Sequence, residues 1–120
     1  TLDVYNDGKM RRDFTYVDDI VSGVMSCLSS PPKGDNGRLP YAVYNLGNSR
    51  SEGLMDVINI IERELGRRAD INFKPIQPGD VTETYADITD ATADFGFKPR
   101  INIADGLPKF IRWYREFYKV

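Results

Sequence analysis

Two arginines follow a glycine turn near the start of the chain, in the run Gly8–Thr15 (GKMRRDFT) just before a predicted helix. Guanidinium groups form paired hydrogen bonds with phosphate oxygens, and free backbone N–H groups at a helix start also bind anions. Arg11 and Arg12 are therefore candidates for a phosphate-binding site. A solvated basic patch is the alternative interpretation. The adjacent Asp13 is expected to pair with a nearby backbone group or arginine.

A second polar run, Gln77–Asp87 (QPGDVTETYAD), combines an amide, a tight turn, a carboxylate and an aromatic ring within about ten residues. A loop of this composition presents hydrogen-bonding groups of the kind that hold a sugar or a ribose. Pro-Gly-Asp is also ordinary turn chemistry, so a purely structural turn is the alternative.

Several kinds of chemistry are excluded by composition. The chain has no histidine and a single cysteine, Cys27, which rules out histidine-based zinc sites, histidine-dependent triads and an internal disulfide. We therefore expect a reducing compartment, the cytoplasm. Sixteen basic residues against eighteen acidic ones give a net charge of −2, so nucleic acid is not an expected partner. No apolar run approaches the ~20 residues that span a bilayer, and no membrane partner is expected.

The length of 120 residues, 41% of them hydrophobic, fits one globular domain with a hydrophobic core. The chain opens on an alternating run, Thr1–Tyr5, without an initiator methionine. This beginning predicts that the sequence is a piece of a longer protein.

Apolar spacing and turn residues predict an α/β chain with short strands and about four helices. In order, we expect a strand over 1–5, a turn at 6–8, a helix that ends before Pro31, a polar loop over 31–40, a strand over 41–46, a helix that is capped by Ser49 or Ser51 and stops at Gly66, a strand over 71–76, a turn at 77–80, a short helix over 87–96 and a last helix over 103–118.

Five runs, in their order and spacing, resemble the C-terminal part of the NAD-dependent epimerases of nucleotide sugars, in the extended short-chain dehydrogenase family. The runs are GKMRRDFTYVDDIV from Gly8, VYNLGNS from Val43, QPGDVTETYAD from Gln77, DFGFKP from Asp94 and WYREFY from Trp113. They cover nearly the whole chain, and the subgroup that they resemble is UDP-glucuronate 4-epimerase.

The resemblance implies a parent enzyme that binds NAD in an N-terminal Rossmann domain and inverts C4 of a UDP-sugar through a 4-keto intermediate. The family's glycine-rich phosphate motif, its Tyr-x-x-x-Lys pair and its catalytic Ser or Thr have no counterpart here. Residues 1–120 are therefore expected to form a single C-terminal substrate-binding domain without catalytic or NAD-binding residues, inactive by itself. The implied partners are a UDP-sugar and the Rossmann domain of the same protein, and a homodimer is compatible with the family.

Matched residue by residue, Arg12 corresponds to the arginine that grips the diphosphate in this family, a task that suits a two-pronged guanidinium. Tyr5 corresponds to a position that lines the uracil pocket, with Asp3 contributing backbone contacts.

Asp80 corresponds to the carboxylate that accepts hydrogen bonds from the ribose hydroxyls, and Tyr85 is expected to close the same pocket. Gln77 stands where UDP-galactose 4-epimerases usually have arginine, a departure that resembles the glucuronate subgroup. The alternatives are part of a UDP-hexose 4-epimerase or of a UDP-glucuronate decarboxylase, or a non-catalytic module that binds nucleotide sugars.

Overall fold

A computed structural model describes residues 1–34 and 39–120, and in them the expected α/β content is confirmed. The elements in chain order are β1 (Leu2–Val4), the 3₁₀ helix η1 (Asn6–Gly8), β2 (Arg11–Asp13), α1 (Val17–Ser29), β3 (Ser51–Gly53), α2 (Leu54–Leu65), β4 (Ile71–Phe73), α3 (Thr89–Phe95) and α4 (Ile103–Tyr118). The middle of the polar loop predicted over 31–40, residues 35–38, lies outside the described residues.

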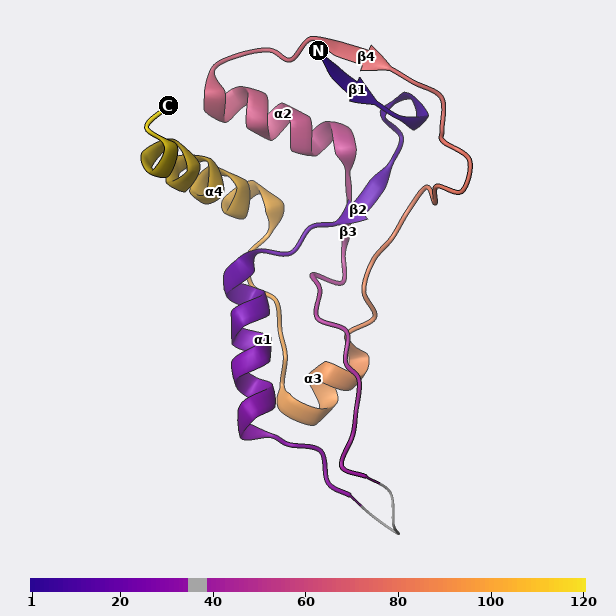
Figure 1. The fold of residues 1–120 in the computed structure, drawn as a ribbon, viewed down its shortest axis with the longest axis vertical. Coiled ribbons are helices and arrows are strands. Elements are labelled where there is room, and N and C mark those ends of the chain that lie inside the picture. The colour runs from indigo at the N-terminus through magenta and orange to yellow at the C-terminus, as the bar shows by residue number, and fades with distance from the viewer. Residues whose placement is uncertain (35–38) are drawn as a thin grey trace.

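The molecule is elongated. Its extents are 58 × 38 × 20 Å and its radius of gyration is 18.1 Å, against about 14 Å for a compact domain of this length. Figure 1 shows α2, α4, β1 and β4 at one end, α1 and α3 toward the other, and β2 and β3 between them. Within the described residues, no helix is long and apolar enough to cross a membrane.

Two small sheets join segments that are distant in sequence. β1 pairs in parallel with β4, with Leu2 opposite Ile71. β2 pairs antiparallel with β3, with Arg12 opposite Glu52. The strand predicted over 71–76 is shorter than expected because pairing with β1 stops at Phe73.

The buried side chains form two clusters. At one end α2 packs against α4, and Val57 and Ile58 of α2 and Ile111 of α4 are each at most 9% exposed. Toward the other end α1 packs against α3, where Phe97 is 3% exposed and lies close to Gly23 of α1. As predicted, α2 stops at Gly66, which adopts a left-handed conformation with φ of 64°.

The apolar stripe of α1 lies on the surface of this chain. Val17, Val21, Val24 and Leu28 recur at helical spacing and are 50–72% exposed. The buried side of α1 instead holds Asp19, whose carboxylate accepts hydrogen bonds from the backbone N–H groups of the segment before α4.

The strand predicted over 41–46 is wrong, because this segment forms no β-ladder in the described structure. Tyr44 instead donates a hydrogen bond of 2.6 Å to Asp94 and packs edge-on against Phe95. Tyr41 and Val43 are 77% and 71% exposed. β-branched and aromatic residues favour a strand only where a neighbouring strand supplies hydrogen bonds, and sequence alone does not supply that neighbour.

The predicted cap of the second helix is also wrong. Gly53 is the N-cap of α2, with no hydrogen bond from a side chain, because Ser51 is drawn into β3 by its pairing with Asp13. Neither β2 nor β3 was expected from the sequence.

Candidate functional site

The strand that carries the two arginines is held on both edges. β3 lies along one edge of β2. Along the other runs the 82–84 segment, where the N–H of Arg11 donates to the carbonyl of Thr82 at 2.9 Å and the N–H of Thr84 donates to the carbonyl of Arg11 at 3.3 Å. The first predicted run, GKMRRDFT, therefore lies directly beside the second, QPGDVTETYAD.

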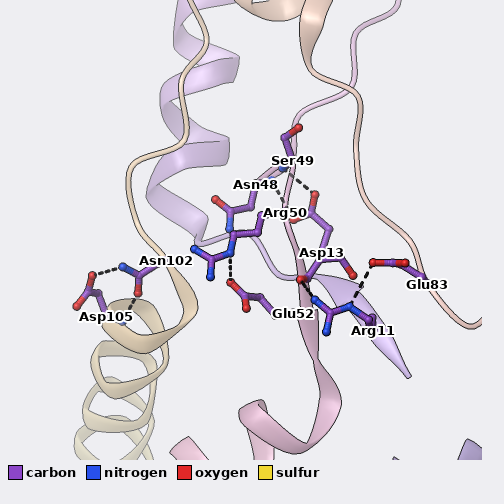
Figure 2. Close-up of polar contacts among 10 residues, drawn as sticks. Arg11, Asp13, Asn48, Ser49, Arg50, Glu52, Glu83, Asn102 and Asp105 are labelled. Carbon is purple, nitrogen blue, oxygen red and sulfur yellow. Dashed lines mark hydrogen bonds and ion pairs between the residues drawn. The ribbon is translucent and has the colours of Figure 1, made fainter. Parts of the chain in front are cut away.

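The two arginines have different surroundings. Arg11 forms an ion pair with Glu83 at 3.2 Å and donates to the carbonyl of Ser51 at 2.5 Å (Figure 2). Arg11 is therefore used to fasten β2 to the segments on its two sides.

Arg12 is half-buried and donates to the carbonyl of Arg11 at 2.7 Å. Glu52, opposite Arg12 in the sheet, pairs with Arg50 at 3.0 Å (Figure 2). Among residues 1–34 and 39–120, no carboxylate lies within ion-pair distance of Arg12. Its charge thus remains available to an anionic ligand.

Asp13 pairs with backbone groups, which was one of the two kinds of partner expected for it. Its carboxylate oxygens accept hydrogen bonds from the N–H groups of Asn48, Ser49 and Ala86 at 2.9 to 3.1 Å, and from the hydroxyl of Thr15 at 3.2 Å. Figure 2 shows Asp13 directed at the Asn48–Ser49 turn.

Tyr5 and Asp3 lie at the β1 end of the molecule. Tyr5 is half-buried and its carbonyl accepts the N–H of Gly8. The backbone N–H of Lys74, just after β4, donates to the carbonyl of Val4, and the carbonyl of Lys74 accepts the N–H of Asp7. These two bonds hold the chain after β4 beside Tyr5. The side chain of Asp3 accepts from Asn72 at 2.8 Å.

Gln77, Asp80 and Tyr85 lie on the connection from β4 to α3, which passes beside β2, and all three are exposed. The N–H of Asp80 donates to the carbonyl of Gln77 at 3.1 Å, and Gly79 has φ of 89°, which confirms the predicted turn. This connection begins beside Tyr5 and passes beside Arg11.

The six predicted residues therefore lie on three consecutive supports, the β1–η1 corner, β2 and the 77–85 connection. Among the described residues, no hydrogen bond or ion pair joins the side chains of any two of them. A 270 Å³ cavity between the starts of α1 and α4, lined by Tyr16, Leu107 and Phe110, and a 440 Å³ groove between α2 and α4 lie elsewhere.

The side chains on this surface can hold a ligand through charge and hydrogen bonds. It provides a guanidinium, carboxylates, an amide and two phenols. Across the part of the chain that the structure describes, no cluster of three metal-ligating side chains is present.

Comparison with known proteins places these observations in context. The model of the GDP-mannose 4,6 dehydratase family matches residues 2–110. Protein CapI of Staphylococcus aureus is 44% identical over 98% of this chain and 39% of its own length. UDP-glucuronate 4-epimerase 2 of Arabidopsis thaliana is 40% identical over 95% of this chain and 28% of its own length. The chain thus spans about two fifths or less of the length of these relatives.

A solved structure is also similar. The UDP-glucuronic acid 4-epimerase of Bacillus cereus, in complex with UDP-glucuronic acid and NAD, superposes with a TM-score of 0.73 and 29% identity. The match covers 94% of this chain and 35% of that one.

Proposed function

Since the chain belongs to the GDP-mannose 4,6 dehydratase family, we propose that it forms the nucleotide-sugar-binding part of an NAD-dependent epimerase. The proposed reaction interconverts UDP-glucuronate and UDP-galacturonate at C4. The observation that carries the proposal is Arg12, a half-buried guanidinium without a carboxylate partner in the described structure, on a strand bordered by the Gln77–Tyr85 connection. A guanidinium in this setting suits a diphosphate.

We assign each of the other five residues to one part of the nucleotide sugar. Asp80 accepts from the ribose, and Tyr5 and Asp3 border the uracil. Tyr85 closes the nucleotide side, and Gln77 provides a neutral amide near the sugar. The segments that carry Tyr5, Asp80 and Arg12 follow one another from the β1–η1 corner through the 77–80 turn to β2, which is the order of uracil, ribose and diphosphate in the ligand.

These residues do not fit NAD. A dinucleotide needs a glycine-rich loop between a strand and a helix, and the sequence contains no G-x-G-x-x-G or G-x-x-G-x-x-G run. We assign NAD and the proton-transfer groups to an N-terminal Rossmann domain of the full-length protein. The exposed apolar stripe of α1 is consistent with a surface that this domain covers.

The full-length protein is expected to convert UDP-glucuronate to UDP-galacturonate in the presence of NAD, with a higher kcat/KM than for UDP-glucose. The measurement is product analysis by chromatography together with initial rates for both sugars. A preference for UDP-glucose would contradict the glucuronate assignment and favour a UDP-hexose epimerase. Release of carbon dioxide would identify a decarboxylase, and tight UDP binding without turnover would favour a non-catalytic module.

Asp80→Asn is expected to raise the Kd for UDP about tenfold, since an amide is a weaker acceptor than a carboxylate for hydroxyl donors. Thermal stability should change little, because Asp80 is exposed on a turn and its carboxylate forms no ion pair with the residues that the structure describes. Calorimetric titration and thermal unfolding separate the two effects.

Asp90→Asn is the matched control, because Asp90 is an exposed carboxylate on α3 outside the proposed site. Equal UDP affinities in the two variants would show that Asp80 only shapes the turn.

A further inference from the structure

Asp13 joins three parts of the chain that lie far apart in sequence. Its Oδ1 accepts the N–H of Asn48, and its Oδ2 accepts both the N–H of Ser49 and the N–H of Ala86. Gly47 lies so close that a Cβ there would be 3.0 Å from Oδ2 and in steric conflict with the Cβ of Ala86. One carboxylate thus fastens the end of β2 to the 47–49 turn and to the end of the predicted binding loop.

Every second residue of the 82–86 segment forms a hydrogen bond with β2, and the bond from Ala86 is the last of these. Arg11 bonds to Thr82 and Thr84 through its own backbone, as neighbouring strands do. The next N–H of the same series, that of Ala86, bonds to the side chain of Asp13 instead. Tyr85 lies between Thr84 and Ala86, the last two residues of the loop that bond to β2. Arg12 lies between Arg11 and Asp13, the two residues of β2 that receive these bonds.

We propose that Asp13 is a positioning residue of the nucleotide-sugar site, which holds the 84–86 segment against β2 and so fixes Tyr85 relative to Arg12. This inference rests on the proposed function. Asp13 does not touch the ligand in this scheme. It acts by setting the separation between a group on β2 and a group on the loop, because the backbone ladder alone ends at Thr84.

A second carboxylate of the same chain supplies the comparison. Asp19 is 5% exposed and also accepts two backbone N–H groups, those of Arg100 and Ile101, at 3.1 and 2.9 Å. It fastens α1 to the segment before α4, which carries none of the six proposed site residues. Asp13 and Asp19 therefore share their chemistry and differ in what they hold.

The test compares Asp13→Asn with Asp19→Asn in the full-length protein, measuring thermal unfolding and the Kd for UDP well below both melting temperatures. Each amide offers one acceptor oxygen and so leaves at least one backbone N–H without its partner. Both variants should melt at lower temperature than wild type. Only Asp13→Asn should also bind UDP more weakly, by about tenfold, because a small displacement of binding groups carries a large penalty.

A double-mutant cycle with Arg12→Ala separates positioning from general loosening. If Asp13 acts through the placement of Arg12, the double variant should lose less affinity than the product of the two single losses. Independent, multiplicative losses would contradict the inference, as would a wild-type Kd in Asp13→Asn or an equal loss of affinity in Asp19→Asn.

If Asp13→Asn does not fold, Asp13→Glu serves instead, since it keeps the charge and both oxygens but is one methylene longer. It should weaken UDP binding, and a wild-type Kd would overturn the inference. The proposed function fails separately. If the wild-type protein does not bind UDP, both proposals are wrong. If Arg12→Ala loses affinity for UDP and the Asp13 variants do not, the proposed function stands and the role of Asp13 is wrong.

Discussion

Arg12→Ala in the full-length protein is expected to weaken UDP binding by about 2 to 4 kcal/mol, the usual loss when one partner of a charge-assisted pair is removed. This corresponds to a rise in Kd of roughly 30-fold to several hundredfold. The expectation rests on the structure, in which the Arg12 guanidinium bonds only to the carbonyl of Arg11 among the described residues. Calorimetric titration with UDP measures it.

Arg12→Lys should recover only part of the loss, because an ammonium carries the charge but not the planar pair of donors. Arg11→Ala is the informative companion, since Arg11 is already paired with Glu83 and Ser51. An unchanged Kd in Arg12→Ala with a large loss in Arg11→Ala would transfer the phosphate-binding role to Arg11.

Gly47→Ala is expected to lower the free energy of unfolding by about 2 to 3 kcal/mol, at the upper part of the range for overpacked sites. Gly47 is buried, and an added Cβ would conflict with the Cβ of Ala86, a short side chain that cannot turn away. Relief would require movement of the backbone that Asp13 fastens on both sides. Equilibrium unfolding in urea measures the change.

Gly53→Ala is the control for Gly47→Ala. A Cβ at Gly53 would lie 2.7 Å from Oδ2 of Asp56, the far end of a side chain that can rotate away. Its loss should be about 1 kcal/mol or less, in line with an alanine at a helix N-cap. Equal losses in the two variants would mean that the 47–49 turn and the 86 segment separate without penalty.

Local pattern was sufficient to predict the helices. Apolar spacing placed α2 and α4, and Gly66 and Gly96 end their helices in the left-handed conformation that glycine adopts at low energy. The turn at Gln77–Asp80 was equally local, because its hydrogen bond joins residues three apart. Such features depend on interactions within one or two turns of chain, which the sequence displays directly.

The assignment of roles to Asp3, Tyr5, Arg12, Gln77, Asp80 and Tyr85 came from resemblance and stays a prediction. What the sequence could not provide is the arrangement that brings β2, β3 and the 82–86 segment together. Asp13 lies 73 residues from Ala86, and Asp19 lies 82 from Ile101. An aspartate near a helix start has the same local signature whether it faces water or binds a distant backbone.

Strand formation shows the same limit from the other side. Tyr41–Leu46 has strand-like composition and forms no ladder in the described structure, whereas Arg11–Asp13 is charged and forms one. A strand exists only where a second segment supplies hydrogen bonds along its edge, so its location is a property of pairs of segments. The sequence by itself therefore determined the helices, the turns and the residue types available for binding. The tertiary structure decided which strands pair, which carboxylates hold the chain together, and that among the described residues Arg11, and not Arg12, is paired with a carboxylate. Each of these depends on contacts between residues far apart in the chain.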